Sequence, residues 1–190
     1  MKFNEYFPNA ILINLDRRID RLEQFEKQAK ELGIEYERFS AVEVKDAVAG
    51  CRESHIKVLK EYDYDPLFIF EDDALFVEGF SEKLPIAMSH LPDDWDVAYL
   101  GAHILKAEDH NEYWLKSYGA SSTHAFAIRG RAKDMLRKSL ESYDGHADRA
   151  FSDIHKDLNV YIVKSTLVWQ APGYSDIQEC EVNYDHLFRF

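Results

Sequence analysis

Short apolar runs alternate along the chain with longer segments in which apolar residues recur every three or four positions. Apolar runs of about four to eight residues are typical of strands buried on both faces of a sheet, and the longer periodicity is typical of amphipathic helices. At 190 residues the chain is long enough for one domain with a substantial core, so we expect a single domain over residues 1–190. The alternation predicts an α/β fold with a mostly parallel central sheet flanked by helices.

The first strand and helix have the clearest pattern. Residues 10–15 form a nearly continuous apolar run, Asp16 is placed to cap a following helix, and Gly33 is placed to end that helix. The remaining strands are expected over residues 36–40, 67–70, 95–100, 123–128 and 160–169, and the remaining helices over residues 52–62, 131–143 and 147–158.

Three adjacent carboxylates, Glu71, Asp72 and Asp73, directly follow the apolar run at residues 67–70. This position is the carboxyl end of a central strand, where ligands bind in open α/β sheets. Neighbouring carboxylates oppose one another's ionisation, and a divalent cation removes that cost. Mg²⁺ and Mn²⁺ commonly bind one or two carboxylates together with substrate phosphates. The triplet therefore predicts a Mn²⁺ or Mg²⁺ site that also holds a diphosphate; the alternative is a solvated acidic turn.

Arginines follow the first predicted strand at positions 17, 18 and 21, at the start of the first predicted helix. Helix N-termini favour anions, so three arginines there are locally unfavourable unless they bind a ligand. Guanidinium groups are well suited to phosphates. We therefore expect Arg17 and Arg21 to face a diphosphate, the alternative being that they only solvate the start of the helix.

Charge and cysteine content narrow the classes of partner and compartment. The net charge of −12 opposes attraction to nucleic acid or anionic lipid. Cys51 and Cys180 lack a Cys-x-x-Cys spacing, so neither a disulfide framework nor a structural zinc site is indicated. No apolar run is long enough to span a bilayer and no signal-peptide pattern follows Met1, so a cytoplasmic protein is expected.

Three stretches of the sequence resemble glycosyltransferase family 25, which contains bacterial lipopolysaccharide galactosyltransferases and collagen galactosyltransferases. They are INLDRRIDR at residues 13–21, AGCRESH at 49–55 and IFEDDA at 69–74. Later stretches fit in the same order, namely LG at 100–101, THAFAI at 123–128, Asp148, and QAPGYSDI at 170–177. The resemblance implies a GT-A fold and an inverting, metal-dependent transfer of a hexose, with galactose as the leading sugar, from a UDP-sugar to an acceptor hydroxyl.

The resemblance also implies which residues bind the donor and the cation. Metal ligands are expected at Glu71, Asp73 and Gln170, and contacts with the nucleotide-sugar at Asn14, Leu15, Arg17, Arg21, Ser54, His55, Glu71, Asp72, Gln170, Ser175 and Asp176. His55 is expected to position Asp73 or a phosphate, although a buried histidine bracing the sheet is the alternative. Gln170, Ser175 and Asp176 belong to a loop that is expected to close over the diphosphate or complete the metal shell. His186 is a candidate remote metal ligand.

An inverting transfer needs a general base to accept the proton of the attacking hydroxyl. The resemblance points to Asp148, with Asp153 and Asp176 as substitutes; the alternative for Asp148 is a first-turn aspartate that interacts with the helix dipole.

Two other classes of function remain open. A carboxylate cluster also suits a metal-dependent nucleotidyl- or phosphoryl-transfer enzyme, and a catalytically inactive sugar-nucleotide-binding module would share the same motifs. No glycine-rich phosphate loop of the Walker or dinucleotide type is present. For glycosyl transfer, the candidate acceptors are lipopolysaccharide or another surface glycan, the hydroxylysine of a collagen-like protein and a hydroxylated nucleobase.

Overall fold

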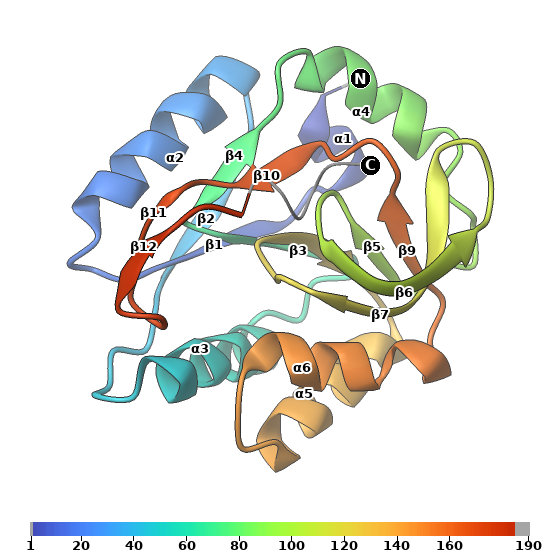
Figure 1. Cartoon of the computed structure of the whole chain (residues 1–190). Helices are drawn as coiled ribbons and strands as arrows, with labels where there is room; N and C mark the ends of the chain where they lie inside the picture. The colour runs from blue at the N-terminus through green and yellow to red at the C-terminus, as the bar shows by residue number, and fades with distance from the viewer. Residues whose placement is uncertain (1, 185–190) are drawn as a thin grey trace.

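A computed structural model of the chain describes residues 2–184 (Figure 1). Its helices are α1 (Phe3–Tyr6), α2 (Ile19–Leu32), α3 (Ala47–Glu61), α4 (Phe80–Met88), α5 (Arg131–Ser142) and α6 (Ala147–Asp153), with a 3₁₀ turn, η1, at His155–Asp157. Its strands are β1 (Ala10–Asn14), β2 (Glu37–Ser40), β3 (Leu67–Glu71), β4 (Ala74–Phe76), β5 (Val97–Tyr99), β6 (His103–Asp109), β7 (Trp114–Ser121), β8 (Ala125–Ile128), β9 (Val160–Val163), β10 (Val168–Gln170), β11 (Gly173–Ser175) and β12 (Cys180–Val182).

The central sheet has eight strands in the order β2-β1-β3-β8-β5-β9-β7-β6. β1 pairs in parallel with β2 and β3, and β5 pairs in parallel with β9. β7 and β8 pair only antiparallel and run against the other strands of the sheet. The predicted α/β class, with a central sheet flanked by helices, is confirmed. Two short antiparallel pairs, β4 with β10 and β11 with β12, lie outside this sheet.

Helices cover both faces of the sheet and create two hydrophobic cores (Figure 1). Alternate side chains of each strand point to opposite faces, so Leu12 and Phe70 join the core under α1, α2 and α4, which also contains Phe25. Ile11 and Ile69 belong to the core under α3, α5 and α6. β1 and β3 are therefore buried on both sides, and their carboxyl ends are fixed in position.

Several predicted elements have different ends in the structure. α3 begins at Ala47 rather than at residue 52, because the Asp46 side chain accepts hydrogen bonds from the amides of Val48 and Ala49 and caps the helix earlier. The predicted helix at residues 147–158 ends at Asp153 and continues as η1. The single strand predicted over residues 160–169 is wrong. The chain turns after β9, and β10 leaves the central sheet to pair with β4.

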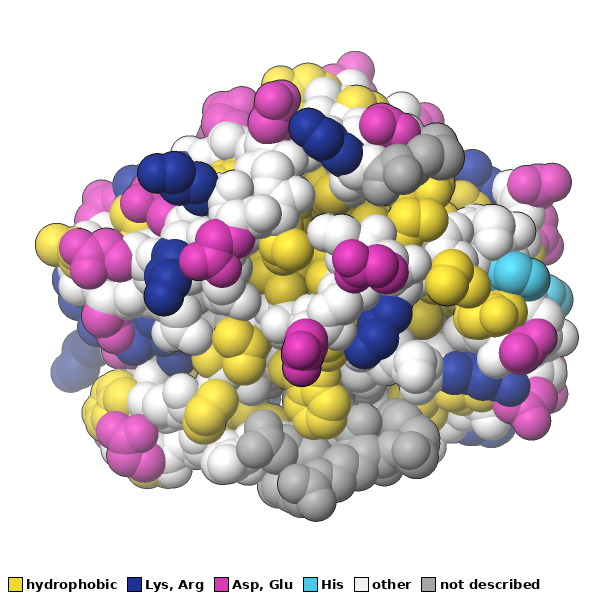
Figure 2. Space-filling model, turned by 90° about the horizontal axis from the view of Figure 1, so that it is seen from above, with side chains coloured by type: hydrophobic (Ala, Val, Ile, Leu, Met, Phe, Trp, Pro, Cys, Tyr) yellow, Lys and Arg dark blue, Asp and Glu magenta, His cyan; other side chains and the backbone are white. Residues whose placement is uncertain are grey.

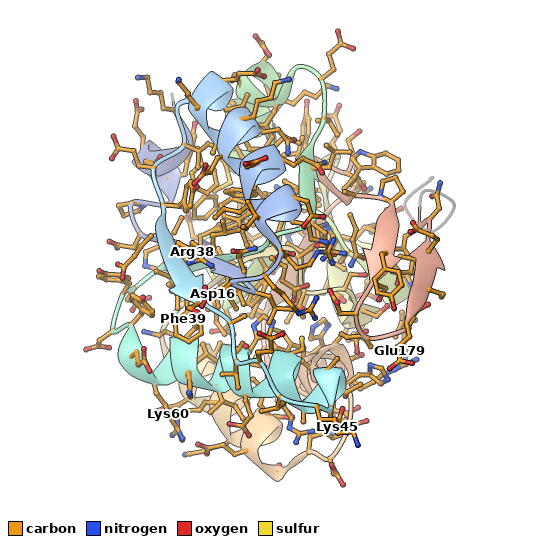
Figure 3. All side chains as sticks on the ribbon, turned by 90° about the vertical axis from the view of Figure 1, so that its left-hand side faces the viewer. Asp16, Arg38, Phe39, Lys45, Lys60 and Glu179 are labelled. Carbon is orange, nitrogen blue, oxygen red and sulfur yellow. The ribbon has the colours of Figure 1, made fainter. Side chains whose placement is uncertain are left out.

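The predicted caps of α2 have different outcomes. Gly33 adopts the left-handed conformation at the end of the helix (φ 65°), as predicted. The prediction that Asp16 caps its start is wrong, because the N-cap residue is Arg18 and no side chain caps that end. Asp16 instead lies beside Arg38 of β2 (Figure 3), with 2.5 Å between its Oδ1 and the guanidinium.

Sequence patterns also missed α4 and the β6–β7 hairpin.

None of the helices between residues 2 and 184 is long and apolar enough to cross a membrane.

Gly101 lets β10 approach the end of β5. The Leu100 carbonyl accepts hydrogen bonds from the amides of Leu167 and Val168, at 2.8 and 3.0 Å. A Cβ atom on Gly101 would lie 1.9 Å from the carbonyl oxygen of Val168, a backbone atom that side-chain rotation cannot move. The absence of a side chain at position 101 therefore allows β10 to pass here and to place Gln170 beside the acidic triplet.

We expect Gly101→Ala to lower the free energy of unfolding by about 1–3 kcal/mol, because β10 must shift to relieve the clash. Gly119→Ala is the matched control, since the nearest atom to its added Cβ is the rotatable Ser152 hydroxyl, at 3.1 Å. Urea denaturation of both variants checks this, and equal losses of stability would contradict the role given to Gly101.

Candidate active site

The acidic triplet opens into a cavity of about 580 Å³ at the carboxyl ends of β1 and β3. The loop before α3 and the β11–β12 hairpin form two of its walls, and Figure 3 shows Lys45 and Glu179 on these two segments. Most predicted site residues line this cavity: Leu15, Arg17, Arg21, Ser54, His55, Glu71, Asp72, Asp73, Asp148, Gln170, Ser175 and Asp176. Asn14 lies behind this lining and contacts Asp72.

Asp72 is paired on both of its carboxylate oxygens. Asn14 Nδ2 donates to Oδ2 at 2.8 Å, and the Arg21 guanidinium donates to Oδ1 at 2.9 Å. Burial raises the pKa of Asp72, and the positive charge of Arg21 opposes that rise. Asp72 therefore ties the end of β1 and the start of α2 to the end of β3.

Asp73 is the least compensated carboxylate of the triplet. Gln170 Nε2 donates to its Oδ2 at 3.0 Å, and Arg21 lies 3.5 Å from the same oxygen. Its other oxygen, Oδ1, is buried and has no hydrogen-bond partner within residues 2–184. Burial and the charge of Glu71 raise the pKa of Asp73 to about 7. A buried carboxylate oxygen without a hydrogen-bond partner fits a hard divalent cation. The cation would offset both the missing hydrogen bond and the free-energy cost of ionising Asp73.

Glu71 is held by two side chains from other elements. Nε2 of His55, on α3, lies 2.9 Å from Oε1 of Glu71, and Thr123 Oγ1 donates to the same oxygen at 2.6 Å. Burial opposes ionisation of Glu71, but the hydrogen bonds from His55 and Thr123 outweigh burial and lower its pKa. An ionised carboxylate only accepts, so Nε2 of His55 carries the proton in this contact. The structure thus places His55 on Glu71, whereas the sequence-based expectation was Asp73 or a phosphate.

The predicted phosphate-binding arginines contact the β11–β12 hairpin. The Asp176 carboxylate accepts from Arg17 at 2.8 Å and from Arg18 at 2.7 Å, while Arg21 donates to the Tyr174 carbonyl at 2.9 Å. Burial raises the pKa of Asp176, but the hydrogen bonds from Arg17 and Arg18 outweigh that effect and lower it. The segment after β10 is therefore fastened to the start of α2 and forms one wall of the cavity.

The candidate general bases differ in their surroundings. Asp148, in the first turn of α6, lines the cavity and forms no hydrogen bond or ion pair with another described residue. Asp153 is exposed at the end of the same helix and does not line the cavity. Asp176 lines the cavity but is bound to two arginines. His186, the candidate remote metal ligand, lies outside the described residues.

Two site features had no sequence signal of their own. Thr123 begins a predicted strand and a stretch that resembles family 25, but no role in the site was predicted for it, and its hydrogen bond to Glu71 depends on the pairing of β8 with β3. Ser122 lines the cavity with φ at 74°, an uncommon value for a residue with a side chain. Ser54, a predicted nucleotide contact, uses its hydroxyl to bind Gly50 and Val42, which fixes the loop before α3.

Comparison with known proteins shows the fold and leaves the family open. No protein-family profile and no curated protein sequence matches the chain. Among solved structures, a glycosyltransferase involved in the glycosylation of the major capsid of PBCV-1 matches with a TM-score of 0.53 and 6% identity, covering 81% of this chain and 80% of that one. A UDP-glucose pyrophosphorylase complexed with UDP-glucose matches with a TM-score of 0.51 and 8% identity, covering 82% and 72%. The A197 protein from STIV is 19% identical over 96% of this chain and 97% of that one, with a TM-score of 0.48. The first two matches show a GT-A type fold.

Between about pH 5 and pH 8, ionisation of Asp73 should cost the metal-free native chain stability that Asp73→Asn does not lose. Its pKa is raised from 3.8 to about 7, so below about pH 7 the folded carboxyl keeps a proton that the unfolded chain has lost, and it releases this proton as the pH rises to about 8. The ionisation cost should lower the free energy of unfolding by about 2–3 kcal/mol over the window. Burial lowers the pKa of His155 to about 4 and also lowers that of His124, so both histidines raise the free energy of unfolding over this window in either protein. Denaturation in EDTA at both pH values should therefore show the loss as a difference between the native chain and Asp73→Asn. Identical pH dependence in the two proteins would contradict it.

Proposed function

We propose that the protein is an inverting, metal-dependent glycosyltransferase that moves a hexose from a UDP-sugar to an acceptor hydroxyl of a surface glycan or lipopolysaccharide. The observation that carries this proposal is the buried, unpartnered Oδ1 of Asp73, a residue that follows β3 and lines a cavity together with arginines. In a GT-A type fold, that combination suits a cation and a nucleotide diphosphate held together.

The cation would be Mn²⁺ or Mg²⁺, held by Asp73, Glu71 and Gln170. Gln170 donates its amide nitrogen to Asp73, which leaves its amide oxygen available as a ligand. Both hydrogen bonds to Glu71 end on Oε1, so its Oε2 is available too. When bound, the cation supplies neutralisation of the charge that develops on the departing diphosphate.

The donor would lie between the end of β1 and the hairpin, with contacts from Leu15, His55 and Ser175. Asn14 and Ser54 are each 1% exposed and would act indirectly, through Asp72 and through the loop before α3. Arg17 already binds a carboxylate, that of Asp176. A diphosphate carries the same charge and the same kind of acceptor oxygens, so it is suited to compete for this guanidinium. Arg21 lies next to both Asp72 and Asp73, where it would face a phosphate oxygen as well as the carboxylates.

Asp148 would be the general base. Its carboxylate is not engaged by another described residue, so it can accept the proton of an acceptor hydroxyl while that oxygen attacks the anomeric carbon. In an inverting reaction the acceptor approaches from the face opposite the leaving diphosphate. Asp148 lies on α6, whereas the acidic triplet is at the end of β3.

The choice of a hexose, with galactose first, is supported by the resemblance of three sequence stretches to family 25. The structural neighbours support a nucleotide-sugar donor, since one is a glycosyltransferase and the other is complexed with UDP-glucose. A glycan acceptor agrees with the net charge of −12, which opposes a nucleic-acid partner. On the face in Figure 2, lysines and arginines are interspersed with acidic side chains and form no continuous basic surface.

A second candidate function is nucleotidyl transfer, which the shared fold of the UDP-glucose pyrophosphorylase favours. The two reactions differ in their products, because glycosyl transfer releases UDP and nucleotidyl transfer releases pyrophosphate. An inactive binding module would bind UDP and release neither product.

The assay that tests the proposal measures UDP release from UDP-galactose, UDP-glucose and UDP-N-acetylglucosamine with Mn²⁺, with and without EDTA. One donor should turn over only with metal, and Asp73→Ala should lower the rate by at least about 100-fold, because the proposed cation ligand is lost. Calorimetry with UDP and Mn²⁺ accompanies the assay, and failure of the two to bind together would overturn the proposal.

A matched pair of variants in the same assay isolates the general base. Asp148→Asn should reduce turnover by about 10²–10⁴-fold with UDP and Mn²⁺ binding retained. Asp153→Asn, on the same helix but outside the cavity, should keep full turnover. Equal rates for the two variants would remove Asp148 from this role.

A further inference from the structure

A cluster of mixed ligand chemistry lies at one side of the same cavity. Cys51 and His55 are one turn apart on α3, and Glu71 ends β3. One ligand atom from each of the three residues lies within 4.8 Å of the others. The cluster offers sulfur, nitrogen and oxygen, whereas Asp73 and Gln170 offer oxygen alone. Soft thiolate and imidazole ligands favour Zn²⁺ over the hard cations Mg²⁺ and Mn²⁺.

Each of the three side chains can supply one ligand atom to a cation. The Oε2 atom of Glu71 accepts no hydrogen bond from another described residue. His55 is 1% exposed, and its Nδ1 has no hydrogen-bond partner in the part of the chain that the structure describes. Ligation through Nε2, which lies 2.9 Å from Glu71, would replace the hydrogen bond between these two side chains, and the ring proton would then be carried by Nδ1. Cys51 is a free thiol.

The position of the cluster allows an ion to enter and to be held. All three residues line the cavity, so the ion would arrive from solvent without opening the core. Asp72, Asp73 and Asp148 line the same cavity and attract cations. Ligand atoms around tetrahedral zinc are roughly 3.3–3.8 Å apart, given bonds of about 2.0–2.3 Å.

We propose that Cys51, His55 and Glu71 form a second cation site, specific for a thiophilic divalent ion such as Zn²⁺, which shares Glu71 with the proposed hard-cation site on Asp73. Three protein ligands leave the fourth tetrahedral position facing the cavity. That arrangement is typical of exchangeable or reactive zinc rather than of closed structural sites. The site does not depend on the glycosyltransferase proposal, because it is defined by its ligands alone.

The test is a titration of the reduced, metal-free chain with Co²⁺, which substitutes for zinc and reports thiolate ligation by a near-ultraviolet charge-transfer band. One equivalent should produce the band, and Zn²⁺ should remove it. Cys51→Ser and Cys51→Ala should abolish the band and weaken Zn²⁺ binding by at least about tenfold, since a thiolate ligand is lost.

Two control variants separate this site from its neighbours. Cys180→Ser should keep the band, because Cys180 is exposed on β12. Asp73→Asn should also keep it, because Asp73 belongs to the other site. Circular dichroism establishes that each variant is folded. The proposal is overturned if the folded native chain gives no thiolate band, or if the band survives in Cys51→Ser and disappears in Cys180→Ser. The Co²⁺ titration contains no nucleotide, so its result would be unaffected if the protein failed to bind UDP.

Discussion

Three adjacent carboxylates at the end of β3, two of them buried and Glu71 half-buried, are the constraint on which the rest of the site depends. Glu71 is compensated by His55 and Thr123, and Asp72 by Asn14 and Arg21. Asp73 accepts a hydrogen bond from Gln170 and lies 3.5 Å from Arg21. Its Oδ1 has no hydrogen-bond partner among residues 2–184. The arrangement is therefore incomplete at one atom of Asp73, a residue that lines the cavity where a cation and a diphosphate would bind.

The same compensation joins parts of the chain that are distant in sequence. Gln170 reaches Asp73 because β10 leaves the central sheet after β9 and pairs with β4, which Gly101 permits. The hairpin that follows is then fastened to α2 through Asp176 and the arginines. The cavity is thus closed on one side by ion pairs, which a competing anion can exchange, rather than by hydrophobic packing.

Local patterns were sufficient to predict β1, α2 and β3, and with them the location of the acidic triplet, because these elements are buried on both faces or strongly amphipathic. β6 was missed because it lies at the edge of the sheet and alternates between exposed and half-buried residues, so it has no apolar run. The hydrogen-bond partners of the acidic triplet depend on long-range packing. His55 was expected to position Asp73 or a phosphate but contacts Glu71. Nothing near Thr123 in the sequence indicates its hydrogen bond to Glu71.

The most direct test of the central claim is an anomalous difference map from crystals grown with Mn²⁺ and UDP. A single strong manganese peak within coordination distance of Asp73 Oδ1, about 2.0–2.3 Å, and in contact with the UDP diphosphate is the result that this account predicts. UDP bound in the cavity with no manganese at Asp73, or manganese bound only at a position away from the triplet, would contradict it.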